Sequence, residues 1–177
     1  DTNKISRAKK IIRDTQTNKI KIGYKFGLEF FYSKEGRKFI SRLKNQTIFL
    51  DLKLNDIPNT VLSAVKSLKN LKISYLTVHL NSGLSALKAL KKESRNMKIV
   101  GVTTLTSLNN KDLKEIGYNK KVNELVRHQA KLATKAKLDA IVCSGHEIRS
   151  VKRVFKKEII TPGIKIYNTK NDQKRVM

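Results

Sequence analysis

The sequence predicts an α/β fold built on a parallel β-sheet. Short runs rich in β-branched and other apolar residues alternate with segments whose apolar residues recur at helical spacing. Several of the predicted strands are apolar almost throughout, as expected for a sheet that helices cover. Strands and helices that alternate with short links are typical of parallel strands joined by right-handed crossovers.

The predicted strands occupy residues 19–24, 47–53, 75–80, 98–104, 140–144 and 159–161. Helical patterns cover residues 5–12, 31–43, 61–68, 84–90, 122–136 and 148–155. The third helical pattern has the clearest apolar stripe, made by Val61, Ala64, Val65 and Leu68. Pro58 precedes it and fits a first helical turn, where the missing N–H is not needed. Longer loops are expected over residues 106–120 and from residue 163 onward.

The length of 177 residues predicts a single domain over residues 1–177. The strand pattern shows six strands, whereas a (β/α)₈ barrel needs eight and typically about 250 residues. Length alone therefore favours an open, doubly wound sheet over a barrel.

The chain is strongly basic, with 39 Lys and Arg against 14 Asp and Glu and a formal net charge of +25. Its 39% of hydrophobic residues exclude a disordered polycation. Nucleic-acid-binding modules usually cluster their basic residues and interleave aromatic rings. Here the basic residues are scattered along the chain and Trp is absent. A solvated basic surface is therefore the favoured interpretation, and a nucleic-acid-binding protein is the weaker alternative.

Cys143 is the single cysteine, so no disulfide within this chain and no cysteine-based zinc site are expected. A reducing, cytoplasmic location fits this usage. No apolar run approaches the roughly 20 residues that cross a bilayer, so no membrane partner is expected. Asp1 stands where a signal peptide or an initiator Met would be, which indicates a fragment.

Three charged residues follow one another at the end of the second apolar strand. Asp51 and Lys53 project to the same side of a strand because side chains alternate, and Asp56 lies in the next loop. A lone Asp-x-Lys is more often a structural ion pair than a reactive site. Other predicted strands also carry polar side chains, most of them at their ends, and the carboxyl ends of parallel strands meet at one face of the sheet. These side chains favour a reactive site over a lone ion pair, and they are Lys21, His79, Thr104, Thr106 and Ser144. Of these, His79 is more often a packed residue than a catalyst.

Lysines held between carboxylates are stabilised in their charged form. This setting suits Lys53 to donate a proton, whereas a Schiff-base lysine requires an apolar or cationic setting.

The segment over residues 51–60, DLKLNDIPNT, resembles the signature of the orotidine 5′-phosphate decarboxylase family. Further segments resemble the family's motifs in the family's order: residues 21–23, 77–79, 101–107, 139–144, 161–164 and 171–173.

The resemblance implies a (β/α)₈ TIM barrel that works as a homodimer. It implies conversion of orotidine 5′-monophosphate to UMP and CO₂ in pyrimidine biosynthesis, with no metal and no organic cofactor. Lys53 matches the proton donor to C6 of the pyrimidine, and Asp51 matches the carboxylate beside the substrate carboxylate. Lys21 matches the lysine that holds this charge array and touches the ribose.

Other residues match substrate-binding positions of the family. Asp56 and Thr60, with Ile57 between them, match residues that reach across the dimer interface into the partner's site. Asp1 matches an aspartate that binds the ribose, and Thr106 matches a residue that contacts the base. The remaining matches lie in the phosphate-binding region: Pro162, Lys165 and Gln173.

Two departures from the family pattern stand out. Lys165 occupies the position of a usual Arg, so it would offer the phosphate a point charge in place of a bidentate fork. The start of the family's first strand and its eighth strand have no match, so we expect an incomplete barrel of six to seven strands. Such an open barrel exposes two edge strands, and we expect residues 1–177 alone to be unstable and inactive.

A rival within the same superfamily is a Mg²⁺-dependent sugar-phosphate decarboxylase or aldolase. Those enzymes share the Asp-x-Lys-x-x-Asp pattern but typically lack the continuation IPNT, present here at residues 57–60.

Overall fold

A computed structural model describes residues 2–94, 96–164 and 175, and in this part of the chain six parallel strands form one sheet. The strands run in chain order across the sheet, and each pairs with the next. They are β1 (Gly23–Gly27), β2 (Thr47–Leu54), β3 (Tyr75–His79), β4 (Lys98–Val102), β5 (Ala140–Val142) and β6 (Glu158–Ile160).

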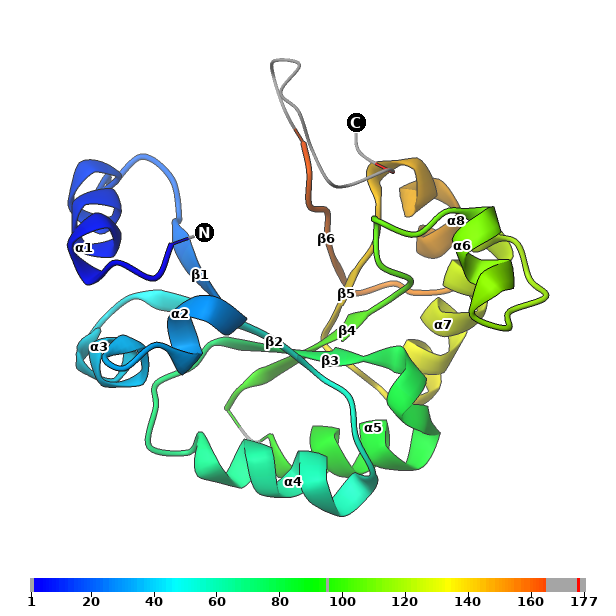
Figure 1. Ribbon diagram of the computed structural model, residues 1–177, viewed down its shortest axis with the longest axis horizontal. Helices are drawn as coiled ribbons and strands as arrows, with labels where there is room; N and C mark the ends of the chain where they lie inside the picture. The colour runs from blue at the N-terminus through cyan, green and yellow to red at the C-terminus, as the bar shows by residue number, and fades with distance from the viewer. Residues whose placement is uncertain (1, 95, 165–174, 176–177) are drawn as a thin grey trace.

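The sheet curls into part of a barrel, with most of its helices on the convex side (Figure 1). A doubly wound sheet would reverse its strand order at a switch point, whereas a barrel adds each strand beside the previous one. The preference for an open sheet that length alone suggested was therefore wrong, and the incomplete barrel is confirmed.

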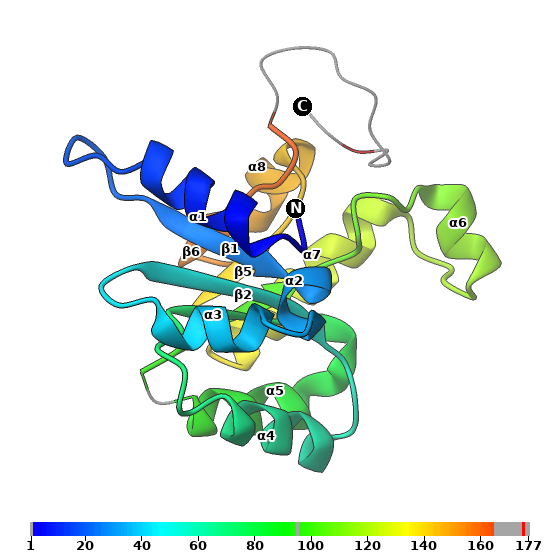
Figure 2. The ribbon, with the colours of Figure 1, turned by 60° about the vertical axis from the view of Figure 1, so that its left-hand side comes forward.

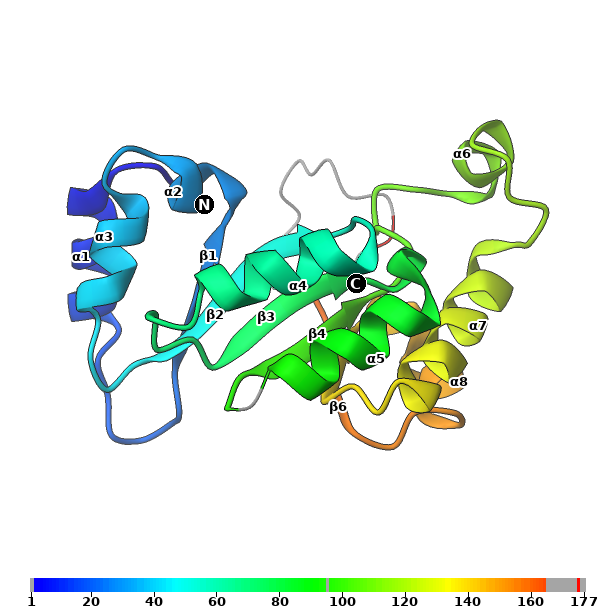
Figure 3. The same cartoon turned by 90° about the horizontal axis from the view of Figure 1, so that it is seen from below.

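Helices follow the strands along the chain, as the crossover pattern requires. The α-helices are α1 (Ile5–Asp14), α2 (Leu28–Tyr32), α3 (Gly36–Arg42), α4 (Pro58–Ser67), α5 (Gly83–Glu93), α6 (Asn110–Glu115), α7 (Val122–Lys135) and α8 (Ile148–Lys152). Two short 3₁₀ helices follow β3 and β5, namely η1 (Leu80–Ser82) and η2 (Gly145–Glu147). Helices α4 and α5 lie side by side against the sheet, below it in Figure 1 and in front of it in Figure 3.

Three local expectations change in the structure. The helix expected over residues 31–43 is two helices, α2 and α3, separated by residues 33–35. Gly36, the first residue of α3, packs so closely against α2 that a Cβ there would overlap the carbonyl of Phe30. The loop expected over residues 106–120 contains α6, whose start is fixed by a capping box between Asn109 and Asp112. Helix α6 projects away from the sheet (Figure 2). The first strand begins at Gly23 rather than at residue 19.

The two faces of the sheet have different side chains because strand residues alternate. One face is apolar and packs against the outer helices, with Leu50, Leu76, Ile99 and Ile141 all at 0% exposure. The other face lines the inside of the curl. Its registered rows contain Lys25 with Phe49, Phe49 with Tyr75, and Tyr75 with Lys98. Charged residues thus lie inside the curl, on the face that a barrel turns toward its axis.

Candidate active site

Two lysines converge on one carboxylate at the carboxyl ends of β1 and β2. The Lys53 Nζ lies 2.9 Å from Asp51 Oδ2, and the Lys25 Nζ lies 3.2 Å from the same oxygen. Asp51 is only 8% exposed, whereas both lysine side chains keep contact with solvent. The array is therefore a buried anion between two partly solvated cations.

The end of β2 is irregular, and this shapes the array. Leu50 pairs with Leu76 and Leu54 pairs with Val78, so three residues of β2 lie opposite the single residue Thr77. Within this bulge Lys53 adopts a left-handed backbone with φ of 49°. Such a backbone costs a non-glycine residue about 1–3 kcal/mol and persists only where neighbours hold it. Lys53 and Asp51 face each other as the alternation predicted, but through a strained bulge rather than a regular strand.

Burial and the neighbouring residues shift the pKa of the Asp51 carboxyl in opposite directions. Burial alone would raise the pKa of the Asp51 carboxyl. The hydrogen bond and charge of Lys53, the charge of Lys25 and a hydrogen bond from Thr77 outweigh burial, and the pKa is lowered overall. Asp51 therefore stays ionised at neutral pH and keeps both ammonium groups in place.

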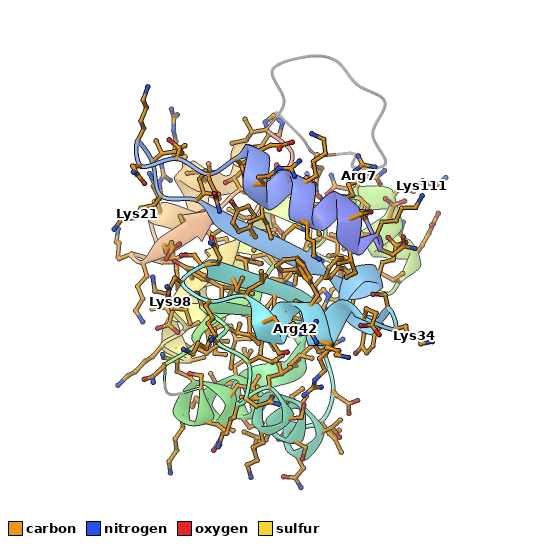
Figure 4. The ribbon with its side chains drawn as sticks, turned by 90° about the vertical axis from the view of Figure 1, so that its left-hand side faces the viewer. Arg7, Lys21, Lys34, Arg42, Lys98 and Lys111 are labelled. Atoms are coloured by element: carbon orange, nitrogen blue, oxygen red, sulfur yellow. The ribbon has the colours of Figure 1, made fainter. Side chains whose placement is uncertain are left out.

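The structure corrects the lysine assigned to this array. Lys21 lies before β1 and is exposed, at the edge of the molecule in Figure 4. Its place beside Asp51 is taken by Lys25, which lies on β1 two residues before the strand ends. Lys25-Phe26-Gly27 repeats the Lys-x-Gly pattern of Lys21-Ile22-Gly23, but only the second copy runs directly into a helix. That position at the carboxyl end of a strand was the available signal.

A cavity of about 510 Å³ adjoins the array. Its lining includes Lys25, Asp51 and Lys53, together with Gly27 and Thr2. Further residues of β1, apolar side chains of α1 and α2, and Glu29 of α2 complete the lining. A volume within the roughly 300–1,000 Å³ of ligand sites is consistent with a bound small molecule.

His79 ends β3 beside this region and is partly buried. Burial lowers the pKa of its imidazole, the charge of Lys53 lowers it further, and Asp51 acts in the opposite direction. A neutral His79 fits the packed role that the sequence suggested.

Asp56, Ile57 and Thr60 lie beyond the array, where β2 leads into α4. All three are exposed, and the Asp56 Oδ1 accepts a hydrogen bond of 2.7 Å from the Ile57 N–H. Within one chain, Asp56 therefore does not join the Asp51 and Lys53 pair.

Thr106 lies in the turn after β4, where several buried polar groups hold the backbone. The Arg175 N–H donates to the Thr106 carbonyl, and the Arg175 guanidinium donates to the carbonyls of Thr104 and Leu105 and pairs with Glu147. On the other side, Gln129 accepts from the Thr104 N–H at 2.9 Å. The loop that presents Thr106 is thus fixed by long-range contacts.

Sequence reasoning singled out Thr104 and Ser144 as polar strand ends but missed Gln129, Glu147 and Arg175. Glu147 is 2% exposed and forms a capping box with Ser144, so the Ser-x-x-Glu pattern was a usable signal. Pro162 lies after β6 and is partly buried. Asp1, Lys165 and Gln173 lie outside the described residues.

Other predicted features can be compared with the described part of the chain. No group of three or more metal-ligating side chains comes together there. None of its helices combines the length and apolarity needed to cross a membrane. The six basic residues labelled in Figure 4 come from separate helices, strands and loops and spread over the view, which favours a dispersed basic surface.

The chain is similar to a well-defined group of proteins. A family model described as "Orotidine 5'-phosphate decarboxylase / HUMPS family" matches residues 1–177. An orotidine 5′-phosphate decarboxylase of Carboxydothermus hydrogenoformans is 41% identical over 167 residues, which cover 87% of this chain and 69% of the relative. One of Bacillus anthracis is 43% identical over 166 residues, covering 86% and 69%.

Solved structures agree with these relatives. The crystal structure of orotidine 5′-phosphate decarboxylase from Lactobacillus acidophilus matches with a TM-score of 0.82 and 30% identity. The match covers 93% of this chain and 79% of that one. The curled parallel sheet, the Asp51 and Lys53 pair and the matching family model together show that this chain belongs to the orotidine 5′-phosphate decarboxylase family.

Proposed function

We propose that, in this decarboxylase of orotidine 5′-monophosphate, the Lys53 ammonium delivers the proton that completes the reaction. The enzyme produces UMP and CO₂ and serves pyrimidine biosynthesis. The observation that carries the proposal is the Lys53 Nζ held 2.9 Å from the buried Asp51 carboxylate, with both residues in the lining of a cavity.

The chemistry explains why such an array is useful. The bond between C6 and the carboxylate breaks, and its electron pair remains at C6 of the pyrimidine. An ammonium fixed near C6 stabilises that charge without reorganising during the reaction. C6 then takes a proton from Lys53, which recovers one from solvent.

Asp51 and Lys25 have supporting roles in this proposal. Asp51 lies beside the departing carboxylate and holds the Lys53 amine in position through the 2.9 Å contact. Lys25, rather than Lys21, is the second lysine on Asp51 Oδ2 and reaches the ribose. Both lysines bind the same carboxylate oxygen, so Asp51 links the two ammonium groups.

A homodimer would complete the site. Ile57 is an apolar side chain with 68% exposure, and it lies between the exposed Asp56 and Thr60 at the start of α4. We propose that these three residues enter the partner's site, with Asp56 as the fourth charge of the array. The remaining substrate contacts that we propose are Asp1 to the ribose, Thr106 to the base, and Pro162, Lys165 and Gln173 to the phosphate. We further propose that the enzyme is cytoplasmic.

The Mg²⁺-dependent sugar-phosphate enzyme is not favoured, because relatives more than 40% identical are orotidine 5′-phosphate decarboxylases. The test is the ultraviolet absorbance change of orotidine 5′-monophosphate with the full-length protein, with and without EDTA. We expect turnover that EDTA leaves unchanged. Activity abolished by EDTA and restored by Mg²⁺, or turnover of a sugar phosphate instead, would contradict the proposal.

A further inference from the structure

Thr77 is a buried hydroxyl at the centre of the charge array that no role yet explains. It lies in the middle of β3 and is 1% exposed. Its Oγ1 donates a hydrogen bond of 3.0 Å to Asp51 Oδ1 and accepts one of 2.7 Å from the Lys53 backbone N–H. A hydroxyl has one hydrogen and two lone pairs, so both contacts can form together.

The first contact divides the Asp51 carboxylate between two kinds of partner. Thr77 binds Oδ1, while the ammonium groups of Lys53 and Lys25 both bind Oδ2. A carboxylate held at both oxygens cannot rotate without losing a buried hydrogen bond. The hydroxyl therefore fixes the direction in which Oδ2 holds the two lysines.

The second contact lies at the bulge of β2. Thr77 is the one residue of β3 opposite the three residues Asp51, Leu52 and Lys53, where the regular pairing of the strands is interrupted. The Lys53 N–H at this point binds the Thr77 side chain. Lys53 keeps its left-handed backbone only because neighbouring groups hold it there, and this hydrogen bond is one of them.

We propose that Thr77 is a positioning residue for the reaction, which fixes the bulge that aims the Lys53 ammonium and orients the Asp51 carboxylate against it. The inference rests on the proposed role of Lys53 as the proton donor. Thr77 acts through Lys53 and Asp51, so its loss should slow the chemical step more than it weakens substrate binding.

A purely structural role would have a different signature. Burial alone predicts that removing the hydroxyl destabilises the fold while the remaining folded protein turns over normally. The chain offers a matched control in Thr103, which is 2% exposed and whose hydroxyl donates 2.8 Å to the Val142 carbonyl on the neighbouring strand. Its contact is to backbone rather than to the charge array.

The experiment compares kcat, KM and thermal unfolding of the full-length Thr77→Val, Thr77→Ser and Thr103→Val variants. Thr77→Val removes the hydroxyl at nearly constant volume, and we expect kcat to fall about 10- to 100-fold with KM within about twofold. Thr77→Ser keeps the hydroxyl and should restore most of kcat. Thr103→Val should keep the wild-type kcat even if its unfolding temperature falls.

Four results would overturn the proposal. They are an unchanged kcat in Thr77→Val, no recovery in Thr77→Ser, an equal loss of kcat in Thr103→Val, and a change confined to KM. If Thr77→Val does not fold, Thr77→Ala replaces it with the same expectations. Failure of both to fold would assign the hydroxyl to the core and also overturn the proposal.

A double variant separates this inference from the proposed function. In a Lys53→Ala background, Thr77→Val should lower the residual turnover much less than it lowers wild-type turnover, because Thr77 acts through Lys53 and the carboxylate that holds it. Wild-type turnover in Lys53→Ala would overturn the proposed function itself. An inactive Lys53→Ala beside a fully active Thr77→Val would overturn only the positioning role.

Discussion

The inner face of the curled sheet has a lysine and carboxylate cluster at each end, and the two clusters differ in burial. At the carboxyl ends of the strands, Lys25 and Lys53 hold Asp51, which is 8% exposed. At the amino ends, Lys98 Nζ lies 3.1 Å from Glu158 Oε2 and 3.1 Å from the Tyr75 hydroxyl.

We call the cluster of Lys98, Glu158 and Tyr75 at the amino ends the lower cluster, and the cluster of Lys25, Asp51 and Lys53 at the carboxyl ends the upper cluster. The lower cluster is a surface ion pair. The side chains of Lys98 and Glu158 are 51% and 39% exposed. The hydrogen bonds of Tyr75 and Glu158 raise the pKa of Lys98, yet solvent screens such exposed pairs. The upper cluster instead combines a buried anion, a strained backbone and a cavity. The same residue types thus form a reactive site at one end and a solvated contact at the other.

The largest expected loss of kcat comes from removing the Lys53 ammonium from the upper cluster. Lys53→Ala should lower kcat by at least about 10³-fold, because it removes both the proton donor and a charge aimed at C6. Lys98→Ala, the matched change at the lower end, should keep the wild-type kcat. Steady-state assays with orotidine 5′-monophosphate measure both, and similar losses would erase the distinction between the two ends.

The next effect tests which lysine completes the upper cluster. Lys25→Ala should lower kcat by about 10²-fold, because one preorganised partner of Asp51 is lost. Lys21→Ala serves as the control, since Lys21 lies before β1, and it should behave as wild type. A larger loss of kcat in Lys21→Ala than in Lys25→Ala would contradict this prediction and would indicate that Lys21 is the lysine beside Asp51.

Acid should reveal the buried carboxylate through stability. The pKa of the Asp51 carboxyl is lowered from its ordinary value of 3.8, so its stabilisation is complete above about pH 4 and is lost as pH falls through the lower folded-state pKa. Asp51→Asn should therefore lose less free energy of unfolding than wild type on acidification below pH 4. Urea unfolding at a series of pH values measures this, and parallel curves would contradict it.

The smallest effect is expected at the lower cluster. A double-mutant cycle with Lys98→Met and Glu158→Gln should give a coupling of no more than about 1 kcal/mol, because the pair is exposed and screened. Added salt should reduce that coupling further. A coupling several times larger would mean that the amino-end cluster organises the barrel interior as strongly as the upper one.

Most of the fold could be predicted because apolar residues recur along the sequence at the spacing of strands or of helices. The strands from β2 to β6 lie close to their predicted ranges, and the alternation brought Asp51 and Lys53 to one face. The first strand was misplaced because residues 19–22, KIKI, alternate as strongly as a strand, whereas β1 has glycine at both ends, which weakens strand propensity. Because the first strand was predicted too early in the chain, Lys21 was assigned to the charge array in place of Lys25.

Thr77 could not be predicted in the same way. Its two contacts depend on an interrupted register between β2 and β3, and no periodic pattern in the sequence marks that interruption. Arg175 is a similar case, because its partners Glu147 and Thr104 are distant in sequence and meet only when the strand ends are side by side. Long-range polar contacts of this kind follow from tertiary geometry.

The most direct test is a crystal structure of the full-length protein with bound UMP. We predict that C6 of the pyrimidine lies about 3–3.5 Å from the Lys53 Nζ, with Lys25 beside the ribose and Asp51 beside the vacated carboxylate position. UMP bound elsewhere, or bound with C6 facing away from Lys53, would contradict it.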